Sequence, residues 1–582
     1  MIKTLASQIK EYKRDAILTP FCMIGEVFCE MLIPLLMGIM VNEGVENGDM
    51  ATIYKLGGGM ILLALLGLMF GMLGGKFGAR ASAGLAKNLR EAMFNNIQTF
   101  SFSNIDKFST PSLVTRLTTD VTNIQNVFQM ILRMFTRAPI TMISAMVLSF
   151  SVNARLASIY LAAVILLGIF INFIIRKATK YFSEIFPKYD DLNESIQENV
   201  TGIRVVKAFV REEDETDKLK RASANIYRLF VNAENIIICN MPAMMLTVYT
   251  CILLVSWFGA HFIVIEGMQT GDLMIMLTYC INILSSLMMV SMMFVFLTMS
   301  AASGKRICEV LNEKSDLTNP ENPVYDIPDG SIDFNHVTFR YHQRSERPVL
   351  DDINLHIHSG ETIGIIGGTG SSKTSLVNLL SRLYDVESGE LMVGGRNVKE
   401  YDLETLRDKV SVVLQKNVLF TGTILENLRW GDPDATLEDC KRVCRLACAD
   451  EFIERFPDGY DTVITQGGTN VSGGQKQRLC IARALLKKPK ILILDDSTSA
   501  VDTATDAKIR KAMAEEIPAT TKIIIAQRIS SVQHADRILV LDNGCVSGFD
   551  THENLIASNE IYREVYESQQ GGNGDFDEGG AA

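Results

Sequence analysis

The sequence predicts a multidomain membrane protein, in which an all-α domain with six membrane spans is followed by an α/β domain. Two observations carry this prediction. Six long apolar segments precede residue 300 of the 582 residues, and strand-like runs alternate with helical runs in the second half. Hydrophobic residues make up 47% of the chain and the mean hydropathy is +0.16, which is high for a soluble protein.

The chain opens on a polar and amphipathic segment, residues 1–15. We expect an interfacial helix on the membrane surface here. A cleavable signal peptide is not expected, because the first apolar run is too long for a signal h-region.

Each predicted span is a run of about 20 apolar residues, the length that crosses the hydrocarbon core. The third run is marginal, because Arg137 interrupts its start. Six such runs in succession argue against buried core helices of a soluble protein, so a membrane domain is predicted over residues 16–300. The runs are Ala16–Val41, Leu56–Gly75, Met134–Val152, Leu156–Ile175, Met241–Val264 and Leu273–Met299.

The connections between the spans alternate in length and charge. The links Lys76–Arg133 and Arg176–Asn235 are long, basic and helical in periodicity, whereas the others are short. The positive-inside rule therefore places the long links, both termini and the second domain in the cytoplasm. Phe102–Phe108 and Gly202–Val210, near the middle of the long links, are the predicted tips that contact a cytoplasmic domain.

Proline and glycine mark a linker at residues 301–330, and the predicted α/β domain follows over residues 331–568. Its strand-like runs are SIDFNHVTF, ETIGIIG, VSVVL, KILILDD, TKIIIA and RILVLD, and they predict a largely parallel sheet. The Gly-rich acidic tail, residues 569–582, is expected to be disordered.

Charge and cysteine content restrict the function. The net charge of −11 argues against nucleic acid as a partner, because a phosphate-binding surface needs clustered Lys and Arg. Cys440, Cys444 and Cys448 share one helix face, and we interpret them as helix packing in preference to a metal site, which needs a fourth ligand.

A phosphate-binding loop follows the predicted strand ETIGII and opens a helix. In such a loop, backbone N–H groups cradle the phosphates, Lys373 reaches the β- and γ-phosphates, and Thr374 holds Mg²⁺. Ser372 stands where the pattern has its second glycine, so its side chain either crowds the loop or donates a hydrogen bond to a phosphate. The predicted nucleotide-binding residues are Gly367, Gly368, Thr369, Gly370, Ser371, Ser372, Lys373, Thr374 and Ser375.

Two further elements point to the same chemistry. Asp495 ends a buried apolar strand, the place of a Mg²⁺-organising carboxylate in phosphate-loop NTPases. Between the loop and this strand, Ser472, Gly473, Gly474 and Gln475 precede a helix and form a second anion site. The three elements in this order are far more specific than one phosphate loop alone.

With these motifs the chain resembles an ATP-binding-cassette (ABC) exporter half-transporter over essentially its whole length, with a type I exporter-like membrane domain. Ser472–Gln475 resembles the family signature. The resemblance implies that Tyr341 stacks on adenine, that Gln415 senses Mg²⁺ and water, and that the loop ending in Asp502 crosses a dimer interface. GIRVVKAFVRE in the second long link resembles a coupling helix. The implied cofactors are ATP and Mg²⁺, the latter held by Thr374, Gln415 and Asp495.

Two positions depart from the family pattern. Asp496 stands where the family has the general-base Glu, and its shorter side chain sets the carboxylate back by about 1 Å, which can cost on the order of 100-fold in rate. Gln527 stands where the family has its switch His and carries no titrating proton. We interpret the site as binding ATP and hydrolysing it slowly, the alternative being a sluggish but working Asp496.

Because ATP in this family is held between one chain's phosphate loop and the other's signature, this chain would complete a partner's site. The resemblance is thus to the degenerate-site subunit of a bacterial heterodimeric multidrug exporter. The predicted partners are a homologous, non-identical half-transporter, the lipid bilayer and an amphipathic small molecule, in the cell membrane. Peptide or lipid export, or a non-transporting ATP-gated or regulatory subunit, are the alternatives.

Side chains within the spans leave two questions open. The sixth span is rich in methionine, which suits a surface accepting varied apolar shapes but equally suits lipid or helix contacts. Glu26 and Glu30 lie one turn apart in the first span, where they either attract cationic substrates or pair with Arg137, Lys76 or Arg80. We favour structural pairing.

Overall fold

The structure is a computed structural model that describes residues 1–341, 347–496 and 501–571. Contacts divide the chain into two compact units. The first, the membrane unit, comprises Met1–Gln98 and Ser109–Glu313; the second, the cassette unit, comprises Thr99–Phe108 and Lys314–Ala582. The segment around Phe102–Phe108 therefore belongs with the second unit, although it interrupts the first in sequence.

The membrane unit is entirely helical in its described residues. Short helices α1 (Ile2–Ser7) and η1 (Lys10–Tyr12) precede the first span, so the N-terminal segment is helical as far as the start of α2. The remaining elements are α2 (Lys13–Ile39), η2 (Met40–Val45), α3 (Met50–Gln98), α5 (Thr110–Thr115), η3 (Arg116–Asp120), α6 (Val121–Met130), η4 (Ile131–Phe135), α7 (Thr136–Val152), α8 (Ala154–Thr201), α9 (Ile203–Ala208), α10 (Glu212–Ile237), α11 (Asn240–Glu266) and α12 (Thr270–Asn312).

In the described part of the chain, six helical segments are long and apolar enough to cross a membrane. Five of the predicted spans fall within these segments, and the sixth, Leu273–Met299, overlaps the segment Thr270–Val290 and continues past it along α12. Helices α3 and α8 run far beyond the predicted spans, to Gln98 and Thr201, which agrees with helical long links. Helix α12 also continues past the predicted end of the membrane domain at residue 300, because Ile307, Cys308 and Val310 keep its apolar face buried.

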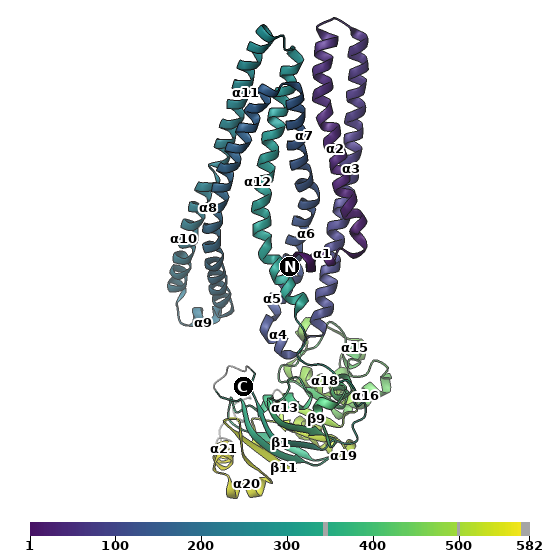
Figure 1. The fold of residues 1–582 in the computed structure, drawn as a ribbon. Coiled ribbons are helices and arrows are strands. Elements are labelled where there is room, and N and C mark those ends of the chain that lie inside the picture. Colours follow the sequence, from purple (N-terminus) through teal and green to yellow (C-terminus); the bar gives the residue numbers. More distant parts are fainter. Residues whose placement is uncertain (342–346, 497–500, 572–582) are drawn as a thin grey trace. The chain divides into compact units, whose positions relative to one another are not determined.

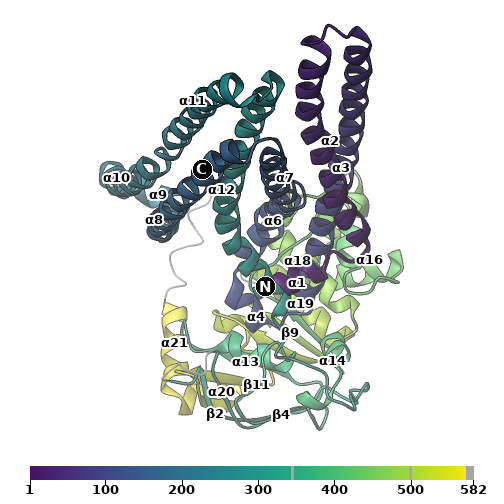
Figure 2. The same cartoon turned by 45° about the horizontal axis from the view of Figure 1, so that its top comes forward.

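The spans pack as a bundle in which α2 lies along α3, and α8 lies along α10 and α11 (Figures 1 and 2). Helices α7 and α12 pack against each other between these groups. Buried tyrosines join the helices: Tyr160 donates a hydrogen bond to the Met276 carbonyl at 2.9 Å, and Tyr279 donates to the Met31 carbonyl at 2.7 Å. Their hydroxyls are therefore satisfied inside the apolar bundle.

An ion-pair cluster joins the first and third spans. The Arg137 guanidinium donates to Glu26 Oε1 at 2.9 Å through one terminal nitrogen and to Glu30 Oε2 at 2.8 Å through the other. Of the three predicted cationic partners, Arg137 is the one that the structure pairs with both carboxylates. The favoured interpretation, structural pairing, is confirmed.

The cassette unit has the alternation of strands and helices expected for an α/β domain. Its larger helices are α13 (Lys373–Leu380), α14 (Leu403–Lys409), α16 (Leu437–Leu446), α18 (Gly473–Leu486), α19 (Thr503–Glu516) and α21 (Glu560–Gly571), with shorter helices α4 (Phe102–Phe108), α15 (Ile424–Leu428), α17 (Asp450–Ile453) and α20 (His552–Ser558). Helix α21 reaches Gly571, so the tail predicted from residue 569 begins as helix, and its remainder lies outside the described residues.

The main sheet has the order β12-β11-β3-β10-β9-β6, parallel except for the antiparallel edge strand β12. Its strands are β3 (Thr362–Ile366), β6 (Val410–Val413), β9 (Ile491–Asp495), β10 (Thr521–Ile525), β11 (Arg537–Asp542) and β12 (Cys545–Asp550). The parallel strands are those predicted from apolar runs, because strands covered on both faces read as continuous hydrophobic stretches.

A second, antiparallel sheet of order β2-β1-β4-β5 was not predicted as a separate layer. It contains β1 (Ile332–Phe339), β2 (Leu350–Ile357), β4 (Ser388–Val393) and β5 (Arg396–Asn397). Buried and exposed residues alternate along β2, so the strand is not a continuous apolar run and its sequence does not stand out as a strand. The short strands β7 (Gly422–Thr423) and β8 (Val463–Ile464) pair with each other.

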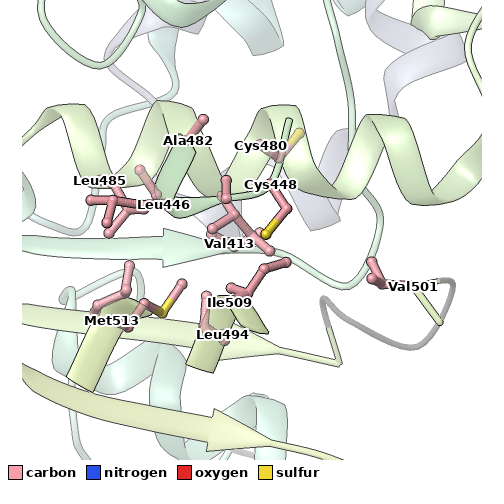
Figure 3. Close-up of a cluster of buried hydrophobic side chains, with 14 of the residues drawn as sticks. Val413, Leu446, Cys448, Cys480, Ala482, Leu485, Leu494, Val501, Ile509 and Met513 are labelled. Carbon is pink, nitrogen blue, oxygen red and sulfur yellow. The ribbon is translucent and has the colours of Figure 1, made fainter. Parts of the chain in front are cut away.

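A core of apolar side chains lies beneath the main sheet, between α16, α18 and α19 (Figure 3). Cys440, Cys444 and Cys448 all belong to it, at 0%, 0% and 9% exposure, which confirms their interpretation as packing residues. Burial raises the pKa of the Cys444 thiol to about 12, so it stays an uncharged, hydrophobic group.

Candidate nucleotide-binding site

The phosphate loop connects β3 to α13, at the carboxyl edge of the parallel strands where α/β proteins bind ligands. A Cβ at Gly367 would lie 2.3 Å from the Leu541 carbonyl oxygen, so no larger residue fits. Gly370 has a φ of 85°, in the left-handed region that favours glycine. The first turn of α13 then offers its free N–H groups to an anion.

The sequence left open whether the Ser372 side chain crowds the loop or donates a hydrogen bond, and its backbone conformation bears on this. Its φ is 72° and its ψ is 22°, the left-handed conformation in which a Cβ is unfavourable by about 1–2 kcal/mol. Its side chain makes no capping hydrogen bond to α13. The departure from glycine thus introduces backbone strain with no capping interaction in return.

Lys373 folds over its own loop. Its Nζ donates to the carbonyls of Gly367 and Gly368, each at 2.8 Å, and to Ser371 Oγ at 3.2 Å. Burial lowers the pKa of Lys373, while Asp495 and Asp496 act in the opposite direction. The ammonium group therefore lies in the loop that would receive the phosphates.

The predicted Mg²⁺ ligands Thr374 and Asp495 are in direct contact. Thr374 Oγ1 donates to Asp495 Oδ2 at 2.9 Å. Burial raises the pKa of Asp495, and the charge of Asp496 adds to the effect. A carboxylate and a hydroxyl at this distance are oxygen ligands of the kind that Mg²⁺ takes beside nucleotide phosphates.

The two positions that depart from the family pattern, Asp496 and Gln527, are in contact with each other. Gln527 Nε2 donates to Asp496 Oδ2 at 2.9 Å, and Gln415 Nε2 approaches the same oxygen at 3.5 Å. The side chains of Gln415 and Gln527, from the loops after β6 and β10, thus meet the carboxylate of Asp496, which follows β9. Its oxygen is held by neutral amides, which accept no proton near neutral pH.

The signature segment sits at the start of α18. Ser472 Oγ accepts a hydrogen bond from the Gln475 N–H at 3.3 Å, and Gln475 Oε1 accepts one from the Ser472 N–H at 2.9 Å. This capping box presents Gly473 and Gly474 at an exposed helix N-terminus. None of these hydrogen bonds reaches the phosphate loop, so the two predicted anion sites are separate within one chain.

Asp502 caps α19 by accepting the Thr505 N–H at 2.9 Å, which lowers the pKa of its carboxyl. Residues 499 and 500, which precede Val501 in the loop ending in Asp502, lie outside the described residues. On the other side of the site, Tyr341 hydroxyl and Ser375 Oγ lie 2.9 Å apart, which sets the tyrosine beside α13.

Tyr384 was missed by sequence reasoning, although it connects two predicted elements. Its ring lies 5.0 Å from Tyr341 and 6.0 Å from Phe102 of α4, and its hydroxyl donates to Asp106 Oδ2 at 2.7 Å. Ser101 and Ser103 also donate to Asp316. The link tip Phe102–Phe108 is thus bonded to the cassette unit; a tyrosine shortly after the α13 helix offers no motif that would reveal this.

Comparison with known proteins decides the family. Residues 16–288 match the family model described as the ABC transporter transmembrane region, and residues 350–499 match the family model described as ABC transporter. The uncharacterized ABC transporter ATP-binding protein YfiB of Bacillus subtilis (strain 168) is 36% identical over 98% of both chains. The chain belongs to the ABC transporter family.

Other relatives of this ABC transporter have the same layout. An uncharacterized ABC transporter ATP-binding protein of Mycobacterium bovis is 35% identical over 98% of both chains. A bacterial Atm1-family ABC exporter, solved with ATP bound, superposes with a TM-score of 0.80 at 23% identity, covering 96% of this chain and 98% of that one. The transporter therefore has the ABC exporter fold, with its membrane region and its ATP-binding domain fused in one chain.

Proposed function

We propose that this ABC transporter exports amphipathic small molecules as one subunit of a heterodimer, and that its own ATP site hydrolyses slowly. The membrane domain would alternate between inward- and outward-facing forms as ATP closes and hydrolysis reopens the cassette pair. The main support is the Asp496 carboxylate, which accepts a hydrogen bond from the Gln527 amide at 2.9 Å. The family has a glutamate and a histidine at these two positions.

The geometry at Asp496 supports slow hydrolysis. A general base must reach a water in line with the γ-phosphate, and Asp496 is one methylene shorter than the family residue. The Gln527 amide donates to one of its oxygens but provides no proton relay. Gln415 beside the same oxygen completes a site suited to holding Mg²⁺-ATP in place.

A partner subunit is supported by a groove of about 440 Å³ on the cassette unit. Phe420 and Trp430 stack at its side, with centroids 4.1 Å apart and planes 6° apart, although both rings are largely exposed. Exposed stacked aromatics suit an apolar helix from another chain. Around α9, Val205, Phe209 and Val210 are exposed apolar residues of the matching kind. We propose that a partner's equivalent of α9 fills this groove.

The partner is proposed to be a different protein, because the signature of this chain keeps the family pattern and its other ATP-site motifs depart from it. Its signature, Ser472–Gln475, has an intact capping box and an exposed Gly473, whereas its phosphate loop, base and switch positions all depart from the pattern. A homodimer would contain two weakened sites. A partner that supplies a glutamate and a histidine would contain one effective site, completed by this chain's signature.

An amphipathic substrate is supported by a cavity of about 300 Å³ in the membrane unit, lined by Met23, Met130, Met134 and Met289 with polar groups from Asn126, Gln129, Arg133 and Arg137. Thioether side chains adapt to varied apolar shapes. Only part of the sixth-span methionines serves this purpose: Met289 lines the cavity, Met276 and Met293 are buried, and Met274 and Met292 are exposed.

We place the protein in the cell membrane. The basic long links support a cytoplasmic location for both termini and for the cassette unit. The Arg137 pairing supports a structural role for Glu26 and Glu30, since one guanidinium is in contact with both carboxylates.

ATP turnover tests the proposal. The chain is purified alone and co-expressed with a homologous half-transporter from a neighbouring gene, and Asp496→Ala is compared with alanine at the partner's equivalent position. We expect the partner's variant to abolish turnover and Asp496→Ala to preserve most of it. Brisk hydrolysis by this chain alone, abolished by Asp496→Ala, would refute both the heterodimer and the slow site.

A gain of function sharpens the test. Asp496→Glu combined with Gln527→His should raise turnover at this site by about 100-fold, the scale of a correctly placed base. Asp408→Glu, on an exposed carboxylate paired with Lys487, is the matched control and should change nothing. ATP-dependent accumulation of drug, peptide or lipid in inverted vesicles then separates the substrate classes, and its absence with all three would favour a regulatory subunit.

A further inference from the structure

A second cavity in the cassette unit runs along α19, from Thr503 toward the beginnings of β3 and β10, and none of its described lining residues belongs to the phosphate loop. It measures about 450 Å³ and lies between α19, the start of β10 and residues 530–535. Thr362 and Lys522, which line it, stand at the beginnings of β3 and β10, whereas the phosphate loop and Gln527 follow the ends of the same strands. The cavity is therefore distinct from the candidate ATP site.

The polar part of the lining is basic. Arg510, Lys511, Lys522 and His534 contribute to it; the described lining residues include no carboxylate, and the exposed Lys511 is paired at its outer end with Glu515, at 3.9 Å. Convergent cations in a concave site attract an anion. Three permanent or titratable cations beside a histidine suit the double charge of a phosphate monoester better than a single carboxylate.

Lys522 is the least exposed of these groups, at 4%. Among the described residues its Nζ donates a single hydrogen bond, at 2.9 Å to the Thr520 carbonyl, although an ammonium group has three donors. Burial lowers the pKa of Lys522, and the charge of Asp536 counteracts this. No carboxylate lies within ion-pair distance of it in the described part of the chain, so an incoming anion would be its ionic partner.

Arg510 shows the same shortage of acceptors. Its terminal nitrogens donate to the carbonyls of Ser530 and Ser531 at 3.2 and 2.9 Å and contact Asp506 at 3.2 Å. Its Nε is buried and makes no hydrogen bond. A buried donor without an acceptor is unfavourable, so this wall of the cavity favours a ligand rich in acceptors.

The remaining lining is apolar. Met513 and Ile524 are nearly fully buried and lie beneath the cavity, and Ala514 and Ala535 flank them. Figure 3 shows Met513 among the core side chains that support this wall. Such a floor accepts a flat apolar body and excludes water from it.

We propose that this cavity binds a small aromatic phosphate, with its ring against Met513 and Ile524 and its phosphate beside Lys522, Lys511 and Arg510. The ligand class follows from the combination of an apolar floor with a basic wall. The proposal does not depend on export, on a partner subunit or on which site hydrolyses ATP.

Pyridoxal 5′-phosphate is a suitable probe, because it is an aromatic phosphate whose aldehyde condenses with an uncharged lysine amine, releasing water. Borohydride then transfers hydride to the imine carbon and makes the bond permanent. The full-length protein in lipid nanodiscs is treated with substoichiometric probe in saturating Mg²⁺-ATP, which protects Lys373. Peptide mass spectrometry measures modification at each lysine.

We expect Lys522 to be modified before Lys508 of α19, although Lys522 is buried and Lys508 is exposed. Pyridoxal, which lacks the phosphate, should modify Lys522 about tenfold less, and Lys511→Glu should reduce labelling about tenfold by reversing one nearby charge. Lys508→Glu, on α19 but outside the lining, is the matched control and should leave labelling unchanged. Modification of Lys522 no faster than of Lys508, equal labelling by pyridoxal, or equal effects of the two charge reversals would each overturn the proposal.

Discussion

The Arg137 cluster offers a direct test of how the membrane unit is held together. One guanidinium bridges Glu26 and Glu30, which lie on the first span, from the third span, at 2.9 and 2.8 Å. The Arg137→Met substitution keeps a long apolar side chain but leaves two carboxylates one helical turn apart without their partner. Both must then stay charged in an apolar setting or bind protons.

The magnitude follows from this loss. Charged side chains within a membrane helix cost about 2.5–3.5 kcal/mol each, and breaking a buried pair costs about 3–5 kcal/mol. Because these side chains are only partly buried, with Arg137 at 35% exposure, we take the lower value, about 3 kcal/mol. For a unit of this size, that corresponds to a fall in Tm of about 5 °C.

Intrinsic fluorescence can follow the membrane unit separately, because the chain has two tryptophans, Trp257 in α11 and Trp430 in the cassette unit. Thermal unfolding is recorded in a Trp430→Phe background in nanodiscs. Arg155→Met is the matched control, since Arg155 pairs with Glu266 at 71% exposure and should cost no more than about 1 kcal/mol.

Charge removal on the other side should rescue the variant. Adding Glu26→Gln and Glu30→Gln to Arg137→Met removes the two carboxylates left without a partner, and we expect most of the Tm to return. Equal shifts for Arg137→Met and Arg155→Met, or no rescue by the two glutamines, would refute the view that this cluster is a structural ion pair.

Three further predictions concern other parts of the molecule. Ser372→Gly should raise the free energy of unfolding of the cassette unit by about 1 kcal/mol, by relieving a φ of 72°, whereas Ser372→Ala should not; denaturant titration without nucleotide distinguishes them. Tyr384→Phe removes the hydrogen bond to Asp106 and should weaken coupling, so that substrate stimulates ATPase activity less while basal activity is kept. Gly271→Ala places a Cβ 2.2 Å from the Gly38 carbonyl oxygen, and should lower the Tm of the membrane unit by several degrees, about 2–3 kcal/mol of overpacking.

The order of spans and strands follows from local sequence, because both a membrane helix and a doubly covered parallel strand are continuous apolar runs. The phosphate loop, Asp495 and the Ser472–Gln475 element could likewise be found by their spacing. Strand β2 could not, since alternating burial looks polar on average. Nor could the role of Tyr384, whose partners Asp106 and Phe102 lie far away in the chain.

What the sequence by itself determined was the kind of protein: six spans, a fused ATP-binding cassette, and two substituted positions, Asp496 and Gln527. Only the tertiary structure decided that Gln527 donates to Asp496, that Arg137 joins both intramembrane carboxylates, and that Ser372 adopts a left-handed conformation. The physical reason is that composition and periodicity are local properties, whereas hydrogen bonds, ion pairs and backbone strain depend on which distant residues the fold brings within a few ångströms.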